Sequence, residues 1–217
     1  LANDVATGGD QDYDGALVLG ADAALVAGGD VRFGATVDGA HRLSVHADGA
    51  VVFDAAVGGA TALAGLDVDA SSFDAASGIG VDGGLSVAVR TGDIAQSGAW
   101  RVGGNADFDA GAGAITLSNA GNDFGGAVHL SGGAAVVRDA NALQLGTLDV
   151  AGLTATSGGT LSLGSGNIRG DLVASSAGDI TQQGALIVTG TGDIDAGSGR
   201  IQLGHANNDF QSTLHLA

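Results

Sequence analysis

Apolar residues alternate with polar or small residues in short triplets along the whole chain. These triplets include "LVL" at 17–19, "LSV" at 43–45 and 85–87, "ITL" at 115–117, "VHL" at 128–130 and "LSL" at 161–163. Alternation with this period places the apolar side chains on one face of a β-strand. Glycine, asparagine or aspartate follows each triplet within a few residues and favours a turn. The pattern predicts many short strands joined by tight turns, with no room for crossover helices.

A longer repeat contains these triplets. Residues 92–130 align without a gap with residues 178–216, at an offset of 86, and 21 of the 39 aligned positions are identical. The retained positions are mainly apolar residues and turn residues, which is what a folding unit preserves. In the frame "NDFGGAVHL" at 122–130, the apolar residues should face a core. Asn122 and Asp123 should form a tight turn, and His129 should point outward.

Short strands with dense turns suit either a β-sandwich or a solenoid, and the long repeat favours the solenoid. With roughly 20 residues per coil, the 86-residue offset corresponds to about four coils, and residues 1–217 form one solenoid of about ten coils. At ~4.8 Å per coil the rod would be roughly 45–50 Å long. Equivalent positions should stack along it, which would place His129 and His215 ~19 Å apart.

The composition supports this all-β interpretation. The chain of 217 residues has 41 glycines and no proline, cysteine or methionine; all its acids are aspartate and all its strong bases are arginine. Without glutamate and lysine, long helices are disfavoured. No apolar stretch reaches the ~18 residues of a transmembrane helix. Because the first residue is Leu1, we expect a piece of a longer protein, and the absence of a leader says nothing about targeting.

The formal net charge is −17. Such a surface repels phosphate backbones and anionic lipid headgroups, so we expect neither nucleic-acid binding nor membrane insertion. The acid should keep copies of a β-rich protein apart in solution. However, lysine and proline commonly protect the edges of sheets, and both are missing, so the ends of the rod could associate with other copies or with neighbouring repeats.

Two carboxylate pairs are the candidate functional residues. Asp107 and Asp109 flank Phe108, and Asp193 and Asp195 occupy the same places in the second copy. Each pair should face solvent with its carboxylates roughly 7 Å apart, a spacing that suits acid–base work on a glycosidic bond. The surrounding glycines also partly match calcium-binding nonapeptide repeats. The favoured interpretation is solvated acids beside a turn, with no catalytic residue and no cofactor; Ca²⁺ is the one metal considered.

The remaining candidates are expected to be structural. Trp100 stands where the second copy has Leu186, which predicts a core aromatic with Arg101 pointing outward. The histidines are expected on the surface, too far apart to share a metal ion. No nucleophile elbow of the form GxSxG occurs, so no serine triad is assigned.

Several ordered runs resemble a known protein family. The runs "ATVDGAHRLSV" (35–45), "GDIAQSGAWRV" (92–102), "ITLSNAGNDF" (115–124) and "DANALQLG" (139–146) resemble the repeat region of filamentous haemagglutinin-like adhesins. The resemblance covers roughly residues 10–217. It implies a right-handed parallel β-helix within a large bacterial protein that is secreted or bound to the cell surface. Such proteins leave the cell through a two-partner transporter or an autotransporter barrel, and they serve in adhesion, aggregation and biofilm formation.

We therefore expect a non-enzymatic structural stalk of an extracellular or outer-membrane surface adhesin. Its partners would be other copies, neighbouring repeats, or a glycan or protein on a host or cell surface. A glycan-binding or glycan-cleaving β-helix is the first alternative, and it requires Asp107 and Asp109 to lie in a groove with exposed aromatic side chains. A calcium-stabilised extracellular repeat is the second alternative.

Overall fold

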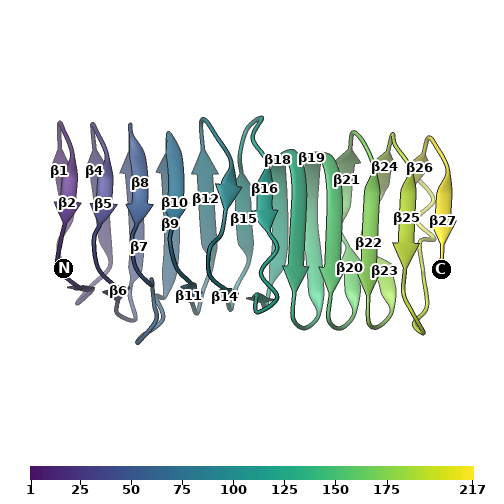
Figure 1. Ribbon diagram of the computed structural model, residues 1–217, viewed down its shortest axis with the longest axis horizontal. Helices are drawn as coiled ribbons and strands as arrows, with labels where there is room; N and C mark the ends of the chain where they lie inside the picture. The colour runs from purple at the N-terminus through teal and green to yellow at the C-terminus, as the bar shows by residue number, and fades with distance from the viewer.

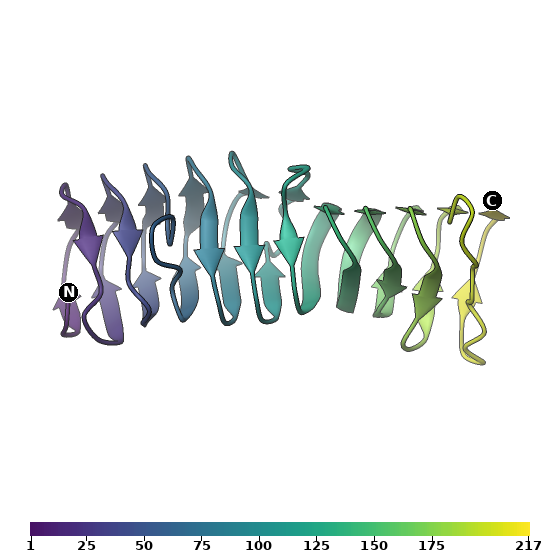
Figure 2. The ribbon, with the colours of Figure 1, turned by 90° about the horizontal axis from the view of Figure 1, so that it is seen from below.

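The computed structural model describes residues 1–217 and consists only of β-strands and turns. The strands stack in parallel as a β-solenoid of about 11 turns. The two termini lie at opposite ends of the rod (Figures 1 and 2). The expected all-β parallel solenoid is thus confirmed, with close to the predicted ten coils. None of the chain is a helix long and apolar enough to cross a membrane.

Strand pairing divides each turn into three segments, which stack into three faces. Face A contains β1 (Val5–Thr7), β4 (Ala23–Ala27), β7 (Arg42–Ala47), β9 (Gly65–Ala70), β12 (Leu85–Val89), β15 (Ala106–Asp109), β21 (Ser165–Ile168), β24 (Leu186–Val188) and β26 (Asp209–Phe210). Parts of two long strands, β18 (Ala127–Asp139) and β19 (Leu143–Ser157), complete this face between β15 and β21.

Face B follows face A along the chain. It contains β2 (Gln11–Tyr13), β5 (Val31–Phe33), β8 (Ala50–Phe53), β10 (Ser72–Ala75), β13 (Ile94–Ala95), β16 (Ile115–Leu117), β22 (Leu172–Ser176), β25 (Gly192–Asp195) and β27 (Leu214–Leu216). The C-terminal parts of β18 and β19 pair between β16 and β22 on this face.

Face C closes each turn with the shortest strands. It contains β3 (Leu17–Val18), β6 (Val37–Asp38), β11 (Ile79–Val81), β14 (Trp100–Val102), β17 (Asp123–Phe124), β20 (Leu161–Leu163) and β23 (Ile180–Gln182). Single bridges at Val57 and Ile201 continue the ladder where no strand forms. Face C is therefore the least regular side of the rod.

The turns differ in length, and the shortest ones contain the longest strands. Leu130 pairs with Leu148 and Leu148 pairs with Gly166, so these turns are 18 residues long. Val102 pairs with Phe124, a step of 22 residues. In the short turns few residues remain for loops, so β18 runs without interruption from face A round the corner to face B. The longer β19 runs from face C through face A to face B.

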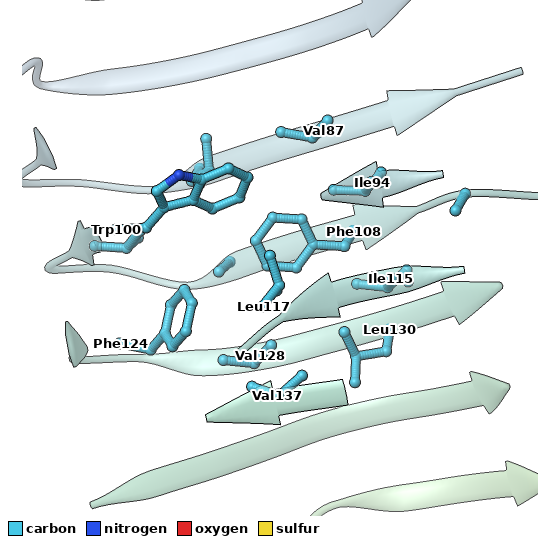
Figure 3. Packing of buried hydrophobic residues seen from close by; sticks show 14 of the residues in the cluster. Val87, Ile94, Trp100, Phe108, Ile115, Leu117, Phe124, Val128, Leu130 and Val137 are labelled. Atoms are coloured by element: carbon cyan, nitrogen blue, oxygen red, sulfur yellow. The ribbon is translucent and has the colours of Figure 1, made fainter. Parts of the chain in front are cut away.

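One continuous core fills the inside of the rod. It contains 53 buried hydrophobic residues drawn from all three faces. Aromatic rings form a column through its first half, with neighbouring ring centroids 4.5–6.4 Å apart: Tyr13, Phe33, Phe53, Phe73, Trp100, Phe108 and Phe124. Figure 3 shows the end of this column beside the aliphatic side chains that continue the core. Trp100 is fully buried, as predicted.

The two copies of the 86-residue repeat do not stack on one another, which corrects the sequence-based expectation. Register partners place Phe108 and Leu130 on face A, whereas their counterparts Ile194 and Leu216 lie on face B. The offset therefore corresponds to four turns and one further face, about 4⅓ turns. The reason is the short turns between the copies, which advance the chain by one extra face. His129 and His215 consequently lie on different faces.

Candidate functional site

The repeated frame contains a buried pair of side-chain amides at a corner of the solenoid. The Nδ2 group of Asn122 donates to Gln96 Oε1 at 2.7 Å, and Gln96 Nε2 donates to Asn122 Oδ1 at 2.8 Å. Asn122 Oδ1 also accepts from the backbone N–H of Trp100 at 2.9 Å, and Nδ2 donates to the carbonyl of Leu117. Asn122 lies at the turn, as predicted, and its side chain is fully buried.

The second copy builds the same pair with the same atoms. Asn208 and Gln182 exchange two hydrogen bonds of 2.8 Å, and Asn208 Oδ1 accepts from Leu186 N–H at 3.0 Å. Asn208 Nδ2 donates to the carbonyl of Leu203. The Asn122–Gln96 pair lies between faces B and C, and the Asn208–Gln182 pair lies between faces C and A. The repeated frame is thus a corner-building unit that works at more than one corner.

Two further polar side chains also accept backbone N–H groups, in the turns between the two copies of the repeat. Asp139 Oδ2 accepts from Phe124 N–H at 2.7 Å, and Ser157 Oγ accepts from Leu143 N–H at 3.2 Å. Both side chains are buried. Together with Asn122, they each accept an N–H from the face C segment of the preceding turn. An unpaired buried N–H is costly, so Asn122 and Asp139 complete the ladder where the chain bends. The N–H of Leu143 also donates to the carbonyl of Thr160 at 3.0 Å, so Ser157 reinforces an existing backbone hydrogen bond.

Burial raises the pKa of the Asp139 carboxyl, and the nearby charge of Asp123 adds to this effect. Backbone N–H groups of Phe124 and Asn141 donate to the carboxylate and act in the opposite direction, but burial dominates. By contrast, hydrogen bonds from the N–H and hydroxyl of Thr191 lower the pKa of the exposed Asp171.

Many exposed aspartates also link adjacent turns. Each of these carboxylates accepts a backbone N–H from a residue 20 to 23 positions later, at 2.7–3.1 Å: Asp4, Asp10, Asp22, Asp30, Asp38, Asp93, Asp171 and Asp179. Hydrogen bonds to ionised groups are stronger than those between neutral groups. The acidity of the chain therefore has a structural basis in addition to its expected effect on solubility.

Four arginines connect the acids of neighbouring turns. Arg32 contacts Asp12, Asp14 and Asp54 at 2.5–3.4 Å, and so links three turns. The other pairs are Arg42–Asp67, Arg90–Asp69 and Arg169–Asp149. These side chains are exposed, so each pair contributes little by itself. They nevertheless neutralise acids that the stacking of turns brings close together.

The structure places the four predicted aspartates on two different faces. Asp107 and Asp109 point outward from β15 on face A, and Asp193 and Asp195 point outward from β25 on face B. Asp109 Oδ1 accepts from Gly111 N–H at 2.9 Å, and Asp195 Oδ1 accepts from Gly197 N–H at 2.7 Å. Gly111 and Gly197 have φ values of 58° and 57°, which favour glycine. Asp109 and Asp195 thus stabilise two identical turns.

Asp107 and Asp109 line a shallow hollow of about 270 Å³ on face A. His129, Thr147 and Asp149 border it, and no arginine or exposed aromatic side chain does. Thr147 N–H donates to His129 Nδ1 at 2.9 Å, which orients the imidazole along the wall of the hollow. His129 points outward, as predicted. The hollow has the acids that the glycan alternative needs, but it has no exposed aromatic side chain and His129 is its single basic residue.

No three side chains of histidine, cysteine, aspartate or glutamate are arranged to hold a metal ion. His41 and His46 each lie beside a single aspartate, at 3.6 Å from Asp22 and 3.1 Å from Asp69. The neighbours of Asp107 and Asp193 across the ladder are His129 and His215, which provide one further ligand each. The nonapeptide-like glycines therefore bring no group of three acidic or histidine side chains together.

Sequence reasoning missed three corner side chains: Gln96, which is half-buried, and Asp139 and Ser157, which are buried. For Gln96 a signal was present, because Gln96/Gln182 and Asn122/Asn208 are identical at the offset of 86. Asp139 and Ser157 have no counterpart in a second copy, and nothing in their local sequence distinguishes them from exposed turn residues.

Replacing Asn122 with alanine should lower the free energy of unfolding by about 2–4 kcal/mol, because several buried groups lose their partners together. Asn208→Ala removes the same hydrogen bonds at a partly exposed corner, where water can replace them, so its effect should be smaller. Chemical denaturation followed by circular dichroism measures both. Equal losses in the two variants would contradict a burial-dependent role.

Asp139 and Asp171 should affect stability with opposite pH dependence. A raised pKa in the folded protein means that the stability of the wild type, relative to Asp139→Asn, falls as the pH rises from 3.8 through the raised value. The lowered pKa of Asp171 predicts the reverse for Asp171→Asn: the wild type gains stability as the pH rises through the lowered value toward 3.8. Denaturation midpoints of the three proteins across acidic and neutral pH give the two slopes. Slopes of the same sign would show that one assignment is wrong.

Calcium should leave the stability of the chain nearly unchanged. Two of the four candidate carboxylates already accept hydrogen bonds from turn glycines, and no group of three acidic or histidine side chains is arranged to hold a metal ion. We expect melting temperatures in millimolar Ca²⁺ and in excess chelator to agree within about 2 °C, because a ligand stabilises only the state that binds it. A decrease of about 10 °C or more on chelation would restore the calcium alternative for Asp107, Asp109, Asp193 and Asp195.

Comparison with known proteins matches the chain to one family of repeats. The family described as "Repeats of unknown function (DUF5649)" matches residues 12–131 and 153–217, which together are most of the chain. No curated protein and no solved structure matches the chain. The matched segments contain both copies of the corner unit, in agreement with their role in folding. The chain therefore belongs to this family of repeats of unknown function.

Proposed function

We propose that the chain is a structural stalk of a filamentous protein on the bacterial surface or outside the cell. The observation that carries this proposal is the single core of 53 residues, which runs through the whole rod with no domain inserted at its side. Stacked turns share one core and one hydrogen-bond ladder, so such a rod resists bending. The resemblance to filamentous haemagglutinin-like repeats supports a role in adhesion, aggregation or biofilm formation.

Contact with further turns is part of this proposal. Apolar side chains at both ends of the rod are only partly covered, including Leu1, Val5 and Leu17 at one end and Phe210 and Leu214 at the other. The backbone ladder is also open at both ends, which favours stacking of another parallel turn. Neighbouring repeats of the same protein, or a second copy, would cover these residues.

The stalk is not an enzyme in this proposal. The hollow at Asp107 and Asp109 has no arginine or lysine in its lining, and polysaccharide cleavage needs groups that shift a pKa or stabilise developing charge. Glycan binding at this hollow is the second candidate, supported by the outward carboxylates alone. Extracellular location rests on the family resemblance, and antibody labelling of intact producing cells would test it.

The stalk proposal predicts a stiff spacer. In cells that display the chain, a small binding domain fused to its C-terminal end should attach the cells to beads coated with the domain's ligand. The rod should hold that domain ~50 Å from its anchor, whereas a glycine–serine linker of equal residue number spans a broad range around ~80 Å. Fluorescence energy transfer between the two ends measures the width of this distribution.

A narrow distribution is expected for the rod and a broad one for the matched linker. Cells displaying the chain without the binding domain should not attach to host cells or immobilised glycans. Saturable attachment by the chain alone, lost in Asp107→Asn, would favour glycan binding over the stalk. A distribution as broad as that of the linker would contradict the stalk directly.

A further inference from the structure

Face B carries an uncharged area in a protein that is otherwise strongly acidic. Six outward-facing residues on β18, β19 and β22 form this area, which we call the face B patch: Ala134, Val136, Gly152, Thr154, Thr156 and Val173. Val173 is 42% exposed, one of the few large apolar side chains that the rod leaves open. A hollow of about 490 Å³ lies over the patch. Since the chain has a net charge of −17, an area of this size without an acid is unusual for its surface.

Two opposite charges lie at opposite corners of the face B patch. Arg138 pairs in register with Thr156, and Leu153 N–H donates to the carbonyl of Asp171, which places Asp171 beside Gly152. Both charged residues are exposed. Arg138 takes part in none of the ion pairs that hold the other arginines.

Asp171 also has a free position for a partner. Its Oδ1 atom accepts both hydrogen bonds from Thr191, at 2.7 Å and 2.9 Å, and leaves Oδ2 available. Relative to Thr154, Arg138 lies two residues further along the strand direction and one turn earlier. Asp171 lies two residues back and one turn later. The two charges are therefore placed symmetrically about Thr154.

This symmetry makes the surface complementary to itself. A twofold axis that lies in the plane of face B and passes through Thr154 exchanges the positions of Arg138 and Asp171 between two copies. We propose that face B binds a second copy of this chain, with Arg138 of each copy opposite Asp171 of the other and the face B patches in contact between them. Elsewhere the faces carry acids, and two acidic faces would repel each other.

The area sets the strength of this association. Three strands at ~4.8 Å and five residues at ~3.3 Å give a face of roughly 240 Å² per copy. Stable complexes bury about 800 Å² per partner, so the dimer is weak and reversible. The dimer gives the proposed stalk a lateral contact, but its test does not depend on the stalk function.

Sedimentation velocity of the full chain, from about 10 μM to about 1 mM, tests the proposal in the affinity range expected for a small interface. We expect a concentration-dependent monomer–dimer equilibrium that stops at the dimer, because a twofold interface closes on itself. Thr154→Asp and Arg138→Asp should each weaken the dimer at least about tenfold, since they place acids against an acidic partner. Asp171→Asn keeps an acceptor for Thr191 and should weaken it by a smaller factor.

Arg101→Asp is the matched control, because Arg101 is exposed on face C and has no ion pair either. It should dimerise like the wild type, and circular dichroism melts should show that all four variants are folded. A wild type that stays monomeric at the highest concentration would overturn the proposal. So would Thr154→Asp and Arg138→Asp variants that associate as the wild type does. Growth beyond a dimer that the face B variants do not change would instead locate self-association at the ends of the rod.

Discussion

The structure depends on pairing each backbone N–H with a carbonyl one turn away. Strands of two to six residues cannot exist alone, so the ladder between turns holds the chain in place. Of the 132 backbone hydrogen bonds, 56 lie outside the strands, which shows that the corners belong to the ladder as much as the faces do. At the corners, the side chains of Asn122, Asp139 and Asn208 accept backbone N–H groups of the preceding turn, and Ser157 shares the N–H of Leu143 with the Thr160 carbonyl.

This constraint explains the restricted composition. Aspartate is short enough to accept an N–H of the adjacent turn from a position in its own turn, and Asp30 and Asp171 show this geometry. Glycine is required where backbones of adjacent turns nearly touch. At Gly166 the φ value is 130°, and an added Cβ would lie 2.0 Å from the carbonyl oxygen of Leu148. Acid and glycine thus follow from close stacking, in addition to any effect on solubility.

The sequence predicts the fold well because the solenoid is built from local patterns. Alternating triplets identify the inward residues, and in "ITL" at 115–117 the apolar Ile115 and Leu117 lie in the core as expected. The face on which each copy of the repeat lies could not be predicted in this way, because it depends on the exact length of each turn between Phe108 and Ile194. Corner residues were equally hidden: Asp139 looks like a solvated turn acid, and only its hydrogen bonds to Phe124 and Asn141 reveal its burial.

A repeat of 4⅓ turns has a consequence for the surface. Features that recur in sequence, such as Asp107 and Asp193, appear on successive faces instead of forming one stripe. No single face of the rod therefore accumulates copies of one motif. This arrangement suits a spacer with varied sides better than a long, regular binding surface, and it leaves face B free to differ from face A in charge.

Spin-label distances would test the stacking of turns most directly, and the absence of cysteine allows labels at chosen sites. Asp109 and Ile187 lie in the same column of face A, four turns apart, whereas Asp195 is the repeat counterpart of Asp109 on face B. The structure predicts ~19 Å between the backbones of the Asp109–Ile187 pair and a longer distance for Asp109–Asp195. The opposite order would show that the repeats stack on one face, and it would contradict the ladder on which this account rests.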